Sequence, residues 1–219
     1  MVIPFEGTNK MFRYSDEEGA LAVRIAREII SDYVKEGKVY QHKDRHKIPQ
    51  KFNEKAGVFV TLESYPELEL RGCIGYPEPI FPLIEALKNA AIGAAADDPR
   101  FFPVDPKELK HIVVEVSLLT PPKLIRVKNP NEYLEKIKIG RDGLIVEKDY
   151  CKGLLLPQVP VEWNWDIKEF LAHTCRKAGL SPEEWKDKDT KIYAFTAEIF
   201  HEIEPHGEIK RKILKPDYN

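Results

Sequence analysis

Apolar residues recur with helical spacing in the segment 15–37, the first strongly patterned part of the chain. Four of them share one face, as in an amphipathic helix packed on a core. These are Leu21, Ile25, Ile29 and Tyr33. Ser15 and Glu18 have the Ser-x-x-Glu spacing of a capping box, and Gly37 is a typical residue at a helix end. The pattern predicts one helix between Ser15 and Gly37.

Two short segments then alternate apolar and polar residues, as half-buried strands do. They are residues 57–63 and 68–74, and the sequence Ser-Tyr-Pro-Glu at 64–67 between them has turn composition. The pattern predicts an antiparallel hairpin. The segment 81–96 is rich in alanine and apolar on most sides, which predicts a helix buried between layers.

The second half of the chain mixes strands and helices without a regular strand–helix–strand alternation. The predicted elements are a strand at 111–119, a helix at 131–136, a hairpin at 137–147 turning at Arg141-Asp-Gly143, a strand at 154–156, a helix at 166–177 and a strand at 191–202. This order favours an α+β fold with two lobes and mostly antiparallel sheets packed with helices. The segments 97–106 and 120–122, which contain prolines, are the expected junctions between the lobes.

The composition is that of a globular protein without a strong charge bias. Of the 219 residues, 42% are hydrophobic and 32% charged, and the formal net charge is −2. Neither nucleic acid nor an anionic membrane is favoured by this balance. Lysine and glutamate are abundant and glutamine is scarce, a usage typical of hyperthermophile proteins. No segment reaches the roughly 18 apolar residues of a membrane span, and no secretory leader is evident, so the cytoplasm is the expected location.

The sequence lacks the common cofactor motifs. It contains no GxGxxG, no Walker A sequence and no CxxC pair. His42 and His46 have the i, i+4 spacing of some zinc sites, but the segment has no helical pattern and no intervening glutamate. We therefore expect no metal, nicotinamide or flavin. The basic cluster at 42–51 is more often a solvated loop than a nucleic-acid contact, so nucleic acid stays a disfavoured alternative.

The sequence Arg71-Gly-Cys-Ile-Gly75 is the most unusual one in the chain. A guanidinium favours the thiolate form of a neighbouring cysteine, and in an ideal strand Arg71 and Cys73 share a face. Gly72 and Gly75 would let the backbone approach a partner closely. The alternative is that Cys73 is a small buried apolar residue and that the glycines serve packing. The residues alone favour this alternative, because free cysteine is among the most buried residue types.

Three polar residues elsewhere are further candidates. Asp98 and Arg100 lie on either side of a proline in the loop after the second predicted helix. A carboxylate and a guanidinium two residues apart can orient a polar ligand, or can pair with each other and cap the preceding helix. Gln158 lies among apolar neighbours, where a buried amide needs hydrogen bonds and can hold its loop together.

The sequence Leu70-Arg-Gly-Cys-Ile-Gly75 is similar to the signature hexapeptide of the AMMECR family. Further blocks resemble the family in the same order, and the similarity covers about residues 12–203, which we expect to form one domain of two lobes. These blocks are Asp98-Pro-Arg-Phe101, Val116-Ser117 followed by Pro121-Pro122, Gly140-Arg-Asp-Gly-Leu-Ile145, Leu154-Leu-Leu-Pro-Gln-Val159 and Cys175-Arg-Lys-Ala-Gly-Leu180. The resemblance implies that the hexapeptide lies near the cleft between the lobes.

The resemblance implies partner proteins but no particular reaction. Prokaryotic members look like one part of a trio with a Memo-like protein and a radical-SAM protein, which suggests a shared modification pathway. Eukaryotic members are proposed to act in nuclear regulation, which the resemblance turns into support for a binding role, and the resemblance implies no catalytic residue.

Two classes of function therefore stay open. The first is an enzyme or enzyme subunit in a modification pathway, with Cys73 as the candidate nucleophile or substrate-contacting thiol. Its ligand-binding residues would be Arg71, Gly72, Gly75, Asp98 and Arg100. The second is a non-catalytic binding or adaptor protein for a peptide, a nucleic acid or a partner protein.

Overall fold

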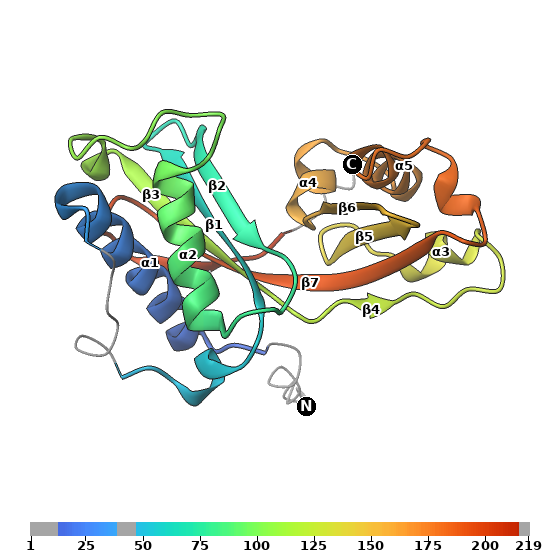
Figure 1. The fold of residues 1–219 in the computed structure, drawn as a ribbon, viewed down its shortest axis with the longest axis horizontal. Coiled ribbons are helices and arrows are strands. Elements are labelled where there is room, and N and C mark those ends of the chain that lie inside the picture. Colours follow the sequence, from blue (N-terminus) through green and yellow to red (C-terminus); the bar gives the residue numbers. More distant parts are fainter. Residues whose placement is uncertain (1–12, 39–46, 215–219) are drawn as a thin grey trace, which may run out of the picture. The chain divides into compact units, whose positions relative to one another are not determined.

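The chain divides into two compact units. The computed structural model describes residues 13–38 and 47–214 (Figure 1). The bounds of unit 1 are Met1–Leu118 and Glu198–Lys212, and those of unit 2 are Leu119–Ala197 and Ile213–Asn219. Unit 2 is thus mostly an insertion between two segments of unit 1.

Unit 1 combines a sheet with two long helices. Its elements are α1 (Asp16–Glu36), η2 (Gln50–Asn53), β1 (Gly57–Ser64), β2 (Leu70–Tyr76), α2 (Leu83–Ala96), η3 (Glu108–Lys110), β3 (Ile112–Leu119), the end of β7 (Lys191–Glu202) and β8 (Ile209–Lys212). The strand order is β2-β1-β3-β7, with β8 also paired to β7. Helix α2 packs on β1 and β2, and α1 packs on α2. The buried faces of these elements form one hydrophobic core.

Unit 2 is smaller and has a hydrophobic core of its own. Its elements are β4 (Lys123–Leu124), α3 (Glu132–Lys136), β5 (Asp142–Lys148), β6 (Cys151–Leu155), α4 (Gln158–Glu162), α5 (Ile167–Lys177), η4 (Glu184–Lys186) and the start of β7. Its sheet has the order β6-β5-β7-β4, and every pair in it is antiparallel. Helix α5 packs on β5 and β6. The chain therefore has the expected α+β class.

Local signals at the first helix produce the structure that the sequence predicts. Ser15 Oγ accepts the Glu18 amide at 3.2 Å, and the Glu18 carboxylate accepts the Ser15 amide at 2.8 Å. Gly37 ends the helix with a φ of 64°, a left-handed conformation that glycine adopts without steric cost. The hairpin of β1 and β2 also forms, with antiparallel pairing.

The hairpin expected to turn at 141–143 turns elsewhere. Strand β5 begins at Asp142 and pairs with β6 through a turn at Asp149-Tyr150. Asp149 has a φ of 52°, which Asp tolerates better than most residues and which tight hairpin turns require. Asp142 is instead buried, and its carboxylate accepts the Lys138 amide and the Arg141 guanidinium. The prediction was wrong because this aspartate fixes the start of a strand.

Candidate functional site

A β-bulge removes Arg71 from the regular pairing of the β1–β2 hairpin. Leu62 faces Gly72, but the next residue along β1, Glu63, faces Leu70. Arg71 therefore has no partner residue on β1. Bulges bend a strand and re-aim its side chains. The expectation that Arg71 shares a face with the cysteine two residues later applies only to an ideal strand, which this segment is not.

The Arg71 guanidinium forms a two-pronged ion pair with Glu108 of η3. Nε donates to Oε1 at 2.8 Å, and Nη2 donates to Oε2 at 3.0 Å. Glu108 also accepts the backbone amide of Asp105 at 2.7 Å. These hydrogen bonds lower the pKa of Glu108, and those from Arg71 have the largest effect. Paired geometry of this kind orients the guanidinium as well as neutralising it.

Asp98 links the loop after α2 to β2, which is the edge strand of the sheet. Its Oδ2 accepts the Cys73 amide at 2.8 Å. The carboxylate also accepts three bonds from Arg100, from the backbone amide at 3.1 Å, Nε at 2.9 Å and Nη2 at 2.7 Å. The Arg100 side chain holds the pKa of Asp98 well below its usual range. Asp98 and Arg100 thus pair with each other, and the carboxylate caps a strand amide rather than the helix.

The guanidiniums of Arg71 and Arg100 both lie against the ring of Phe101. Its ring centroid lies 5.8 Å from Arg71 Cζ and 5.5 Å from Arg100 Cζ, which is within cation–π range. In the part of the chain that the structure describes, the hydrogen bonds of both guanidiniums come from Nε and Nη2. Nη1 of each guanidinium has none there. We call Arg71, Cys73, Asp98, Arg100 and Phe101 the Phe101 cluster.

The Cys73 thiol lies in surroundings that disfavour the thiolate. Burial raises its pKa, while a 3.3 Å hydrogen bond from Thr61 Oγ1 and the charge of Arg100 act in the opposite direction and do not outweigh it. The guanidinium that influences the thiol is therefore that of Arg100, whereas the sequence suggested Arg71. Nucleophilic cysteines usually have a lowered pKa, and this one has the reverse.

The glycines of the hexapeptide allow close packing. A Cβ on Gly72 would lie 2.2 Å from the carbonyl oxygen of Ala94 in α2. A Cβ on Gly75 would lie 2.3 Å from the ring of Phe59. Both distances are far below van der Waals contact. The absence of these two side chains therefore allows α2 to pack closely against Gly72 and the Phe59 ring to pack closely against Gly75.

The AMMECR1 family model matches residues 23–200, a range that includes the whole Phe101 cluster. The chain belongs to the AMMECR1 family. Protein MJ0810 of Methanocaldococcus jannaschii is 59% identical over 198 residues, which cover 90% of this chain and 96% of that protein. Protein PH0010 of Pyrococcus horikoshii is 58% identical over 208 residues, covering 93% and 99%. The crystal structure of PH0010 matches with a TM-score of 0.86 at 57% identity and covers 93% of this chain and 100% of that one.

These AMMECR1 relatives come from thermophilic archaea, in agreement with the composition. Their similarity extends through both units and identifies the family.

Two AMMECR1 site residues were not singled out from the sequence. Glu108 is 37 positions away from Arg71, and no local pattern joins them. Thr61 faces Cys73 across the hairpin. A prediction of the hairpin register would have placed these two residues side by side. Phe101 was noted only as part of a family block.

The other sequence candidates lie apart from this cluster. Gln158 is buried in the short helix α4 of unit 2. His42 and His46 lie outside the described residues. Among residues 13–38 and 47–214, no group of three or more His, Cys, Asp or Glu side chains is arranged to hold a metal ion. No helix in these same ranges combines the length and apolar character that crossing a bilayer requires.

Proposed function

We propose that this AMMECR1-family protein is a binding subunit of a modification pathway, and that its Phe101 cluster recognises an anionic group on a partner protein. The observation that carries the proposal is the convergence of two guanidiniums on one aromatic ring. Arginine and aromatic residues are the residue types that contribute most to protein–protein binding. A preorganised guanidinium also loses less entropy when it binds a carboxylate or phosphate.

The existing ion pairs support this role. Asp98 and Glu108 hold Arg100 and Arg71 in fixed orientations through Nε and Nη2. Nη1 of each guanidinium is left for an incoming acceptor. The Arg100 side chain is 53% exposed and that of Arg71 is 18% exposed. Arg100 is therefore the more accessible contact, and Arg71 the more deeply held one.

A catalytic role for Cys73 is the second candidate. It is favoured by the partial exposure of this residue and by the charge of Arg100, which acts toward the thiolate. It is disfavoured by burial, which has the larger effect on the pKa of the thiol. The binding role requires no thiolate and is therefore better supported by the geometry.

The partners to test are a Memo-like protein and a radical-SAM protein from the same organism. Binding of each purified protein to the wild-type chain, Arg100→Ala and Arg24→Ala is measured by isothermal titration calorimetry. Arg24 is an exposed arginine on α1 and serves as the matched control. We expect wild type and Arg24→Ala to bind alike. We expect Arg100→Ala to bind about tenfold more weakly or worse, because a contact of this kind contributes more than about 1.4 kcal/mol.

The pH dependence of Cys73 alkylation separates the two candidates. A thiol that titrates below the ordinary value of about 8.5, together with unchanged binding by Arg100→Ala, would replace the binding proposal by the catalytic one. A thiol that titrates above that value, together with weakened binding, supports the proposal.

A further inference from the structure

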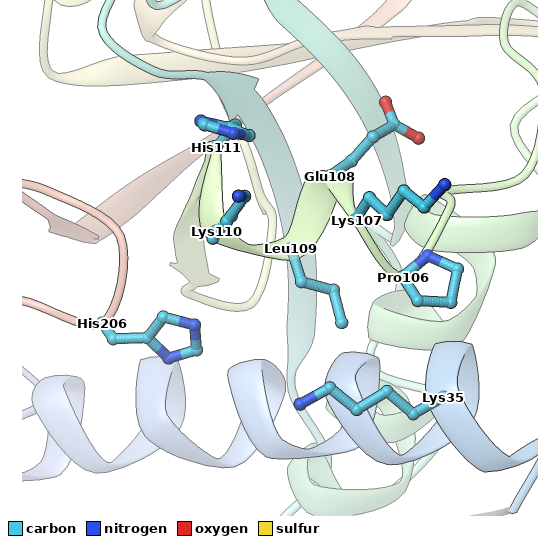
Figure 2. Close-up of a pocket in the computed structure, with 8 residues that line it drawn as sticks. All are labelled: Lys35, Pro106, Lys107, Glu108, Leu109, Lys110, His111 and His206. Carbon is cyan, nitrogen blue, oxygen red and sulfur yellow. The ribbon is translucent and has the colours of Figure 1, made fainter.

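A cavity of about 600 Å³ lies in unit 1 (Figure 2). Three segments supply its walls: the last turn of α1, the stretch around η3 and the turn between β7 and β8. Its lining residues are Lys35, Pro106, Lys107, Glu108, Leu109, Lys110, His111 and His206. We call it the lysine cavity.

The charged side chains that line the lysine cavity are mostly cationic. Lys35, Lys107 and Lys110 come from different positions on its walls (Figure 2). None of the three forms an ion pair with any residue in the described ranges. His111 and His206 add two imidazoles, which can donate hydrogen bonds to an anion. Cations that have no acidic partner are available to an anionic ligand.

The one acidic residue of the lining does not offset these charges. Glu108 is occupied by Arg71 through two hydrogen bonds and by the Asp105 amide. Figure 2 shows its carboxylate on the opposite side of η3 from the Leu109 side chain, which points toward α1. The negative charge of Glu108 is thus neutralised on the far side of the short helix.

The lysine cavity also has an apolar and rigid base. Leu109 is buried, and Pro106 fixes the chain just before η3. The carbonyl of Leu109 accepts Nη1 of Arg27 at 3.2 Å, and Arg27 is itself paired with Glu202 in the interior of unit 1. A base held in this way needs no rearrangement to receive a ligand, and preorganisation of this kind increases affinity.

We propose that the lysine cavity binds a small molecule that carries two or more negative charges. Phosphate and carboxylate groups both have the required chemistry, because lysine binds either as a point charge. The volume lies in the roughly 300–1,000 Å³ range of small-molecule pockets. This proposal does not depend on the binding role proposed above, and the two sites have Glu108 in common, since it lines the cavity and also pairs with Arg71.

The test is an NMR titration of the full-length protein with inorganic pyrophosphate, with citrate, and with sodium chloride at matched ionic strength. The imidazole signals of His111 and His206 are assigned with the variants His111→Gln and His206→Gln. We expect both signals to shift saturably with pyrophosphate, citrate or both, and not with chloride. Binding of pyrophosphate would identify phosphate as the recognised group, and binding of citrate would identify carboxylate.

A second readout uses the protonation of His206. Burial lowers its pKa, and the nearby charges of Arg27 and Lys35 lower it further while Glu202 opposes them. A bound anion counteracts those cations, so the pKa of His206 should rise when the ligand that binds is present. This shift would not follow from binding at a distant surface.

Matched charge variants complete the experiment. Lys107→Gln/Lys110→Gln removes two charges from the cavity, and Lys168→Gln/Lys177→Gln removes two exposed charges from α5 in unit 2. We expect the first pair to weaken binding about tenfold or more, since each removes a charge-assisted contact, and the second to leave it unchanged. Equal weakening by both pairs, shifts that do not saturate, or binding of a glutamate-rich peptide without binding of either small anion would overturn the proposal.

Discussion

Replacing Asp98 by alanine removes one carboxylate that serves both β2 and the loop after α2. The Cys73 amide then loses its acceptor at the sheet edge. A hydrogen bond to a charged group contributes about 1.5–3 kcal/mol. The Arg100 side chain is 53% exposed, so its ion pair adds only about 0–1 kcal/mol. We therefore expect Asp98→Ala to lower the free energy of unfolding of unit 1 by about 1.5–4 kcal/mol.

The adjacent residue provides the control. Asp97 is exposed at the C-terminal end of α2, where a negative charge is not favoured by the helix dipole. Asp97→Ala should therefore change the free energy of unfolding by no more than about 0.5 kcal/mol. Asp98→Asn keeps one acceptor oxygen and should fall between Asp98→Ala and wild type.

The effect should also depend on pH, with a sign set by the lowered pKa of Asp98. A carboxylate with a lowered pKa stabilises the folded state fully above its unfolded value, about 3.9, and loses this contribution as the pH falls toward the folded value. The difference between wild type and Asp98→Asn should therefore be constant near neutral pH and should shrink below about pH 4.

The assay has to report on unit 1. All three tryptophans, Trp163, Trp165 and Trp185, lie in unit 2, so tryptophan fluorescence follows the wrong part of the chain. Amide hydrogen exchange in guanidinium, read at β1 and β2, gives the stability of unit 1 directly. If the Cys73 amide is as well protected in Asp98→Ala as in wild type, Asp98 does not hold the strand edge and the reasoning fails.

Three further predictions follow from packing and burial. Gly72→Ala should cost about 1–3 kcal/mol in guanidinium unfolding, because its Cβ would meet a backbone oxygen of α2 at 2.2 Å; full stability would show that α2 can move away freely. Arg27→Met should lower the free energy of unfolding by about 3–5 kcal/mol, because Glu202 is left charged and buried. The double variant Arg27→Met/Glu202→Leu should recover part of this loss. A double variant no more stable than the single one would argue against the ion pair as the cause. Burial raises the pKa of Cys175 to about 11, so mass-spectrometric mapping should find it alkylated at neutral pH only after unfolding, and rapid native labelling would contradict its buried position.

The sequence predicted those elements whose signals are local. The helix α1 follows from the Ser15 capping box and Gly37, and α5 begins after Asp166, whose side chain accepts the Glu169 amide at 2.8 Å. Such signals act over three or four residues and do not depend on the rest of the fold. The two-residue strand β4 carries too few residues for any pattern, and it was missed.

The candidate site was only partly predictable for the same reason. Asp98 and Arg100 are two positions apart, and their pairing was one of the alternatives open from the sequence. The bulge at Arg71 depends on how β1 and β2 pair, and its contact with Glu108 depends on where η3 lies in the folded unit. Long-range contacts of this kind leave no periodic trace in the sequence.

The insertion of unit 2 into unit 1 determines the order in which the chain can fold during synthesis. Unit 2 is nearly contiguous, from Leu119 to Ala197, and has all four of its strands once β7 has been translated. Unit 1 cannot complete its sheet until Glu198–Lys212 has emerged from the ribosome. Until then Arg27 lacks Glu202, and its charge opposes burial of α1. We therefore expect the N-terminal segment, although it is translated first, to reach its native state only after Glu198–Lys212 has been translated, and nascent unit 1 to be exposed to aggregation until then.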